Sequence, residues 1–190
     1  MGKLLRQSLT MLVMMTLLTG VIYPLVVTGA AQLFFHNTAN GCVIERNGKA
    51  LGSELIGQPF SDPKYFWSRP SATTPFPNNS AASTGSNLGP TNPALIDTVK
   101  QRIEALRGAD PGNTAPAPID LVTASASGLD PHISPAAAQY QLGRVARTRG
   151  MSAADIAKLV AQATEDRTFA VLGEPRVNVL KLNLLLDGKW

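Results

Sequence analysis

The sequence predicts an α+β protein in which one N-terminal transmembrane helix is followed by a single small α+β extracytoplasmic domain. Three observations support this prediction. No Asp, Glu, Lys or Arg occurs between Arg6 and Glu45. The rest of the chain combines strand signals with several helical repeats. Lys3 and Arg6 precede the apolar stretch, so the positive-inside rule leaves the N-terminus in the cytoplasm and exports the remainder. The expected parts are a cytoplasmic N-terminus at residues 1–8, a transmembrane helix at 9–35 and a soluble extracytoplasmic domain at 36–190.

The apolar stretch from Leu9 to Phe35 is long enough to span a membrane. As a helix it rises about 40 Å, more than the ~30 Å hydrocarbon core of a bilayer. Pro24 lacks a backbone N–H, so we expect a kink near Val21. A cleaved secretory signal is the alternative, but the apolar core of such a signal is only about 7–15 residues long. The segment is therefore expected to be an uncleaved anchor.

Composition excludes several classes of partner and cofactor. The net charge of +4 falls to +2 without Lys3 and Arg6, and no cluster of Lys and Arg with interleaved aromatic residues occurs, so no nucleic-acid partner is expected. The single cysteine, Cys42, rules out an internal disulfide. Two distant histidines and one cysteine supply too few ligands for a metal site, so no metal is expected.

The soluble part begins with a hairpin signal and a long uncharged loop. Asn47-Gly48, between apolar runs in residues 41–57, is typical of a tight primed turn. Residues 68–93 consist almost entirely of Ser, Thr, Pro, Asn, Gly and Ala, and Arg69 is their only charge. Disordered segments normally carry more charge, so we expect an ordered loop, held by the domain itself or by a partner. Interface cores are poor in charge and rich in aromatic residues and Arg, and small residues let membrane helices pack closely. The expected docking residues are Phe66, Trp67 and Arg69 in the domain and Gly20 and Gly29 in the anchor.

Helical spacing returns after the loop. Residues 94–107 place apolar side chains on one helical face, and Gly108 and Pro111 end the helix. A Pro/Gly/Ala linker covers 109–118, and a short strand is expected at Ile119–Thr123.

Further helices follow in the C-terminal part. Ser134 and Pro135 open a helix that runs to about Arg149, and Ser152 opens another. Residues 177–186 fit either a strand or a helix capped by Asn178, and the helix is favoured because Asp187-Gly188 would end it.

The stretch 125–135 offers Ser127, Asp130 and His132, the residue types of a hydrolytic triad. Three members within one turn rarely reach triad geometry, so the favoured interpretation is a turn at Asp130 followed by a helix cap at Ser134. No catalytic residue is therefore expected. No G-x-x-x-x-G-K-[ST] loop and no D-K-T-G-T phosphorylation motif occurs.

Polar residues recur on the helix that starts at Pro135. Gln139 and Gln141 stand beside Arg144 and Arg147. They form either an anion-binding face or, more commonly, a solvated helix face.

Five motifs carry a resemblance that covers nearly the whole chain. The chain resembles the KdpC family, the small single-span subunits of bacterial high-affinity potassium-transporting P-type ATPases. The resemblance rests on FWSRPS at 66–71, GSNLGPTNP at 85–93, SASGLDPHISP at 125–135, Q-x-x-R-V-A at 141–146 and VNVLKLNL at 177–184.

The resemblance implies a non-catalytic accessory subunit in the bacterial inner membrane. Its partners would be a channel-like potassium-selecting subunit, an ATP-hydrolysing subunit and membrane lipid. It also implies a catalytic chaperone that raises the ATP affinity of the hydrolysing subunit. The site implied for this role is a nucleotide site shared with that subunit, with Gln141 and Arg144 as contacts and no tightly bound cofactor. The positive-inside rule instead favours an assembly role on the extracytoplasmic side, where ATP is scarce. A tethered periplasmic binding or structural protein and a tethered hydrolase are the alternatives.

Overall fold

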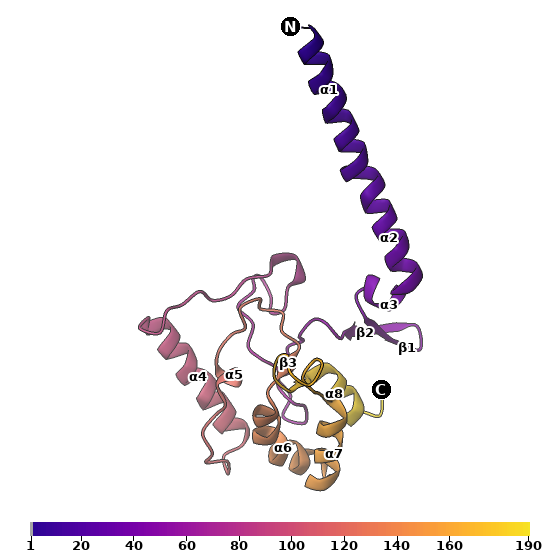
Figure 1. Cartoon of the computed structure of the whole chain (residues 1–190). Coiled ribbons are helices and arrows are strands. Elements are labelled where there is room, and N and C mark those ends of the chain that lie inside the picture. The colour runs from indigo at the N-terminus through magenta and orange to yellow at the C-terminus, as the bar shows by residue number, and fades with distance from the viewer. Residues whose placement is uncertain (1) are drawn as a thin grey trace. The chain divides into compact units, whose positions relative to one another are not determined.

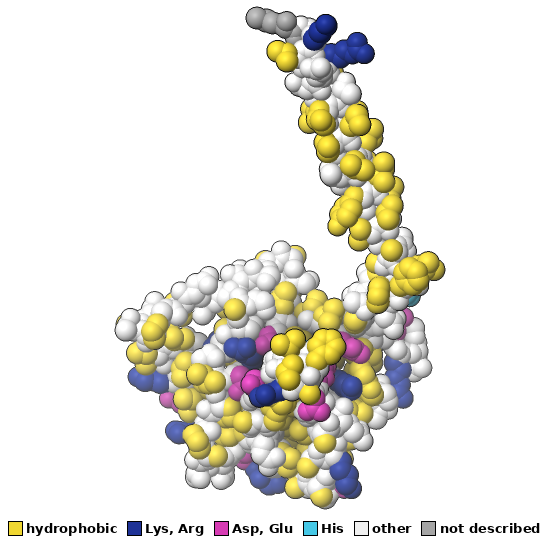
Figure 2. All heavy atoms as spheres, viewed as in Figure 1, with side chains coloured by type: hydrophobic (Ala, Val, Ile, Leu, Met, Phe, Trp, Pro, Cys, Tyr) yellow, Lys and Arg dark blue, Asp and Glu magenta, His cyan; other side chains and the backbone are white. Residues whose placement is uncertain are grey.

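The computed structural model describes residues 2–190 and divides into two compact units, Met1–Val43 and Ile44–Trp190 (Figure 1). The first unit contains α1 (Gly2–Leu17), the π-helical turn η1 (Leu18–Ile22), α2 (Tyr23–Phe34) and the short α3 (His36–Ala39). Gly2–Phe34 is one apolar helix of 33 residues with a mean hydropathy of 2.0, long and apolar enough to cross a membrane. Basic side chains lie at its N-terminal end (Figure 2).

Pro24 disturbs this helix in the predicted place. Because proline donates no hydrogen bond, the turn before it widens: the Tyr23 N–H donates to the carbonyl of Leu18, five residues back. The disturbance around Val21 is therefore a π-helical turn.

The predicted hairpin forms where the second unit begins. Strands β1 (Val43–Arg46) and β2 (Lys49–Ser53) flank Asn47 and Gly48, whose φ angles are +53° and +71°. Positive φ at both central positions defines the primed turn that Asn-Gly favours, so the prediction is confirmed.

A small antiparallel sheet lies at the centre of this unit. Its order is β3 (His132–Ile133), β5 (Arg176–Asn178) and β4 (Thr164–Glu165), with His132 opposite Asn178 and Thr164 opposite Val177. Strands this short need support from packing. That support comes from α6 (Pro135–Arg149), α7 (Ala153–Ala163) and α8 (Val179–Leu186). The largest fully buried apolar side chains are Phe66, Ile133, Val145, Ile156, Val177, Val179 and Leu182.

The helix starts follow the sequence. Ser134 caps α6 by accepting a hydrogen bond from Ala137 N, Ser152 caps α7 through Asp155 N, and Asn178 caps α8 through Lys181 N. The predicted helix at 94–107 is α4 (Pro93–Ala109), with Leu106 as its buried residue.

One expectation about the chain path needs correction. Ile119–Val122 is a short helix, α5, and not a strand. Leu121 and Val122 are both buried, whereas alternate residues of a strand point to opposite faces. In the ambiguous stretch the favoured helix is confirmed: α8 starts after Asn178, its predicted cap, and only Val177 and Asn178 belong to the end of β5.

The uncharged loop is ordered, as predicted, and the domain itself holds it. Apart from the 3-10 turn η2 (Ser80–Ala82), the loop is held by hydrogen bonds from side-chain hydroxyls and amides. Thr73 Oγ1 donates to Phe76 O at 2.8 Å, and Asn78 Nδ2 donates to Gly128 O at 3.1 Å. Gly128 has a φ of +69°, and a Cβ there would lie 2.7 Å from Thr84 O, so only glycine fits this approach of two backbones.

Candidate functional site

The segment around Phe66 and Trp67 is held between two helices by buried amide side chains. Asn183 of α8 accepts from Phe66 N at 2.9 Å and donates to Phe66 O at 3.0 Å. Gln141 of α6 accepts from Trp67 N at 2.8 Å and donates to Trp67 O at 3.1 Å. Successive residues of an extended chain present their N–H and C=O groups to opposite sides, so the two amides replace the neighbouring strands of a sheet. We call this arrangement the amide clamp.

Arg144 of α6 completes the clamp by binding Gln141 and the backbone that precedes Phe66. Its Nη2 donates to Gln141 Oε1 at 2.6 Å and its Nη1 to Tyr65 O at 3.1 Å and to Pro63 O. Its guanidinium lies 4.7 Å from the centre of the Trp67 ring, a cation–π contact. In the described part of the chain no carboxylate forms an ion pair with it. Burial lowers the pKa of Arg144 to about 10.

The structure thus brings the two residues implied for nucleotide binding together, but inside the domain. Gln141 is 1 % exposed and Arg144 3 %. Their polar atoms bind the chain's own backbone, so neither forms a solvated helix face. A ribose or phosphate group reaches them only if the Trp67 segment moves away.

The predicted docking residues of the domain separate into three environments. Phe66 is fully buried, so its side chain is part of the core and presents no surface for a partner. Trp67 is half-buried and its indole N–H donates to Asp62 O at 3.1 Å. With Phe60 and Leu106 it lines a shallow pocket of about 210 Å³ beside α4. Arg69 lies further on, in a second pocket.

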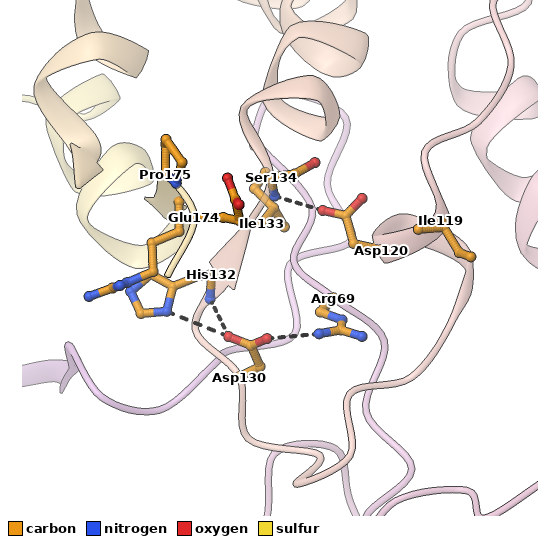
Figure 3. Close-up of a pocket in the computed structure, with 10 residues that line it drawn as sticks. Arg69, Ile119, Asp120, Asp130, His132, Ile133, Ser134, Glu174 and Pro175 are labelled. Atoms are coloured by element: carbon orange, nitrogen blue, oxygen red, sulfur yellow. Dashed lines mark hydrogen bonds and ion pairs between the residues drawn. The ribbon is translucent and has the colours of Figure 1, made fainter. Parts of the chain in front are cut away.

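This second pocket, of about 340 Å³, is lined by part of a chain of ionisable side chains that we call the charge chain, and Figure 3 shows its contacts among Arg69, Asp130 and His132. Arg69 Nη1 donates to Asp130 Oδ2 at 3.0 Å, and the His132 backbone N–H donates to Asp130 Oδ1 at 3.0 Å. The imidazole lies between two carboxylates, with Nδ1 3.5 Å from Asp130 Oδ1 and Nε2 3.7 Å from Glu165 Oε2. Arg176 Nη2, 2.7 Å from the same Glu165 oxygen, ends the chain. The five side chains tie the uncharged loop to the three strands.

Asp130 lies between Arg69 and His132 in this charge chain. Burial raises the pKa of its carboxyl, but hydrogen bonds from His132 and Arg69 outweigh burial and lower the pKa to about 2. Asp130 therefore stays ionised at any physiological pH. Arg69 forms its ion pair with Asp130 through Nη1, and its buried Nε has no hydrogen-bond partner.

No hydrolytic centre forms among the described residues around His132. Ser134 Oγ accepts from Ala137 N at 3.0 Å as the helix cap, and Ser127 Oγ accepts from Leu129 N at 3.1 Å as a turn bond. Neither hydroxyl is hydrogen-bonded to His132, so the turn-and-cap interpretation holds. Within residues 2–190 no cluster of His, Cys, Asp and Glu has the composition of a metal site.

Gly20 and Gly29 have free space around them in the isolated chain. A Cβ on Gly20 would meet only Thr16 Cγ2, at 3.9 Å, and one on Gly29 would meet nothing within 4 Å. A larger residue at either position is therefore tolerated by the helix itself, so any effect on assembly would report a contact outside this chain.

Asn183 was not identified from the sequence as a residue of the clamp. Asn183 had a visible signal, since it is the one polar residue in the Leu-rich run 182–186. A lone amide in a buried helix face needs partners, and here they are the two backbone groups of Phe66.

Comparisons with known proteins cover almost the entire chain. A family model described as "KdpC: K+-transporting ATPase, c chain" matches residues 5–188. A Methylococcus capsulatus protein named "Potassium-transporting ATPase KdpC subunit" is 64% identical over 183 residues, 96% of each chain. A protein of the same name from Polaromonas naphthalenivorans is also 64% identical, over 188 residues, which are 99% of this chain and 96% of that one.

Proposed function

The chain belongs to the KdpC family, the c chain of potassium-transporting ATPases, and from this membership we propose that it is the extracytoplasmic assembly subunit of such a complex. In this family the c chain is an accessory subunit and not the catalytic one. The partners we propose are the channel-like potassium-selecting subunit and the ATP-hydrolysing subunit. The apolar helix Gly2–Phe34 would anchor the chain among them and the surrounding lipid of the inner membrane.

The observation that carries the proposal is the uncharged loop held by hydrogen bonds within the domain. Residues 70–92 carry no charge, yet hydrogen bonds within the domain fix their path. A surface that is ordered before binding loses little conformational entropy on docking, and interface cores are depleted of charge. Trp67, half-exposed beside the loop, is the aromatic anchor proposed for this surface.

Co-purification tests assembly directly. Membranes are solubilised in a mild detergent and the complex is isolated through a tag on the ATP-hydrolysing subunit. The proposal expects this chain to elute in fixed ratio with the other subunits. Recovery of the chain alone, in every mild detergent tried, would instead support the tethered binding or structural protein.

Orientation has its own test at Cys42. Because Lys3 and Arg6 precede the span, we propose that residue 42 and the domain lie on the extracytoplasmic side. A thiol reagent that cannot cross membranes should label Cys42 in intact spheroplasts and should not label the Cys42→Ser variant. Labelling that appears only after lysis would reverse the orientation.

We further propose that any rise in ATP affinity is transmitted through assembly and not through a nucleotide contact at Gln141. The reason is that Gln141 and Arg144 are occupied by the amide clamp. In assembled complex that contains Gln141→Ala, the half-saturating ATP concentration should stay within about threefold of the parent, under ~1 kcal/mol. ATPase rates are normalised to the amount of assembled complex. A tenfold rise would support a chaperone that shares the nucleotide site.

A further inference from the structure

The connection between β4 and β5 forms an exposed hairpin. Thr168 and Leu172 pair through two backbone hydrogen bonds of 2.9 Å, one in each direction. At the base, Arg167 Nη2 lies 2.6 Å from Glu174 Oε2. Every residue from 166 to 174 is exposed, so the tip contributes nothing to the core. We call residues 166–174 the apolar tip.

The apolar tip displays large hydrophobic side chains to solvent. Phe169 is 85% exposed, Val171 73% and Leu172 59%. Hydrophobic side chains are visible on the face of the domain turned to the viewer, in front of β3, with charged side chains around them (Figure 2). Isolated exposed apolar residues are common, but a group of three on one loop indicates an interaction site.

The backbone of the tip is also held in an unfavourable conformation. Phe169 and Ala170 have φ angles of +53° and +63°, a region that residues with side chains rarely adopt. The shorter β1–β2 turn also has positive φ at two successive residues, but there they are Asn47 and Gly48, which adopt such angles readily. Folding alone would therefore favour Asn or Gly at positions 169 and 170. The presence of Phe169 and Ala170 there instead indicates that the tip binds another molecule.

We propose that the apolar tip inserts Phe169, Val171 and Leu172 into an apolar pocket on the exposed face of another subunit of the same potassium-transporting ATPase. This inference rests on the assembly function proposed above. It goes further by assigning an interface to a segment distinct from the uncharged loop and from Trp67.

Charge and rigidity favour a protein pocket over a lipid surface. Loops and helices that bind membranes combine apolar residues with several Lys or Arg side chains. In the tip Arg167 is the only basic residue, and it is paired with Glu174, while Asp166 adds a negative charge. A fluid bilayer gains nothing from a fixed loop shape, whereas a shaped pocket gains affinity from it. The family to which the chain belongs supplies the partner, because its members are subunits of a multi-chain ATPase.

Photocrosslinking in the intact complex identifies the occupant. A benzophenone amino acid replaces Phe169 in the full chain, and in a matched control it replaces Leu55, another exposed apolar residue. We expect position 169 to form an adduct between this chain and one other subunit, at least tenfold more than position 55. Adducts only with lipid, adducts only with a second copy of this chain, or equal yields at both positions would overturn the proposal.

A substitution separates this proposal from the assembly function. The double variant Phe169→Ser, Val171→Ser should lower recovery with the tagged complex at least tenfold in stringent washes, with Leu55→Ser unchanged and with far-ultraviolet circular dichroism unaffected. If the parent chain co-purifies, but the double variant is recovered equally and position 169 yields no subunit adduct, only the apolar tip proposal fails. If the parent itself does not co-purify, both proposals fail.

Discussion

Phe66 and Phe169 occupy opposite environments in the same domain. The first is fully buried in the amide clamp and the second is 85% exposed on the apolar tip. The sequence marks Phe66 as the surface anchor, because it stands beside Trp67 and a long uncharged loop, whereas nothing in its own neighbourhood distinguishes Phe169. The difference shows that an aromatic cluster next to a loop is not evidence of a surface when distant polar side chains are available to bury it.

The two regions also satisfy their backbones differently. The clamped segment obtains its hydrogen bonds from Gln141 and Asn183, which lie 74 and 117 residues away along the chain. The tip satisfies its backbone locally, through Thr168 and Leu172. The clamp therefore depends on the fold of the whole domain. Residues of the tip, in contrast, can be substituted without disturbing that fold.

Truncation of the two phenylalanines gives the largest expected contrast. Phe66→Ala should reduce the free energy of unfolding by about 3–5 kcal/mol, since it leaves a cavity in the core. Phe169→Ala should change it by less than ~0.5 kcal/mol, because no contact in the domain is lost. Urea unfolding of the full chain in mild detergent, followed by circular dichroism, measures both. Equal losses of unfolding free energy in the two variants would contradict the assignment of Phe66 to the core and of Phe169 to the exposed tip.

The clamp itself is tested by a pair of glutamines on α6. Gln141→Ala removes the partner of both Trp67 backbone groups and of the buried Arg144, so it should cost about 3 kcal/mol. Gln139→Ala, the same change at an exposed position of the same helix, should cost less than ~0.5 kcal/mol. The same unfolding experiment applies, and a small loss at Gln141 would mean that the clamp contributes little to stability.

Dependence on pH separates the amide clamp, which contains no carboxyl group, from the charge chain of Asp130. The pKa of Asp130 is about 2, below its usual 3.8, so its ion pair stabilises the domain fully above about pH 4 and is lost as the pH falls towards 2.

Asp130→Asn should remove about 1 kcal/mol of this stabilisation at neutral pH; the value is small because 28% of the side chain is exposed. Between pH 4 and 2 the variant should lose stability less steeply than the parent. A residual slope is expected from Asp187, whose pKa is likewise lowered to about 2: burial raises it, but hydrogen bonds from Arg149, Lys189 and Tyr65 outweigh burial. If the stability of variant and parent changed with pH in parallel, ionisation of Asp130 would not contribute to the stability of the domain.

The smallest expected effect lies in the anchor, outside the domain comparison. Gly20→Leu and Gly29→Leu should leave membrane insertion unchanged, since neither position is crowded within the chain. They should weaken association with the partner subunits by about fivefold, or ~1 kcal/mol, if each glycine faces a helix of a partner. Ala30→Leu, on a different face of the helix, serves as the control, and equal recovery of all three variants would remove the glycines from the interface.

The sequence alone determined the features that depend on neighbouring residues. The membrane-length helix, the Asn47-Gly48 turn and the caps at Ser134, Ser152 and Asn178 were all predicted. Each is set within a few residues, by the absence of charge, by the tolerance of positive φ or by one side-chain oxygen near free N–H groups.

Only the tertiary structure decided which polar and aromatic residues are internal. Gln141 and Arg144 read as a helix face open to solvent or to a ligand, yet they lie at 1 % and 3 % exposure because Trp67 covers them. Ile119–Val122 became a helix because the domain buries Leu121 and Val122 together and Asp120 accepts the N–H of Ser134 at 2.7 Å. Such choices depend on which distant segment comes to lie alongside, and hydrogen-bonding capacity by itself does not specify the partner that uses it.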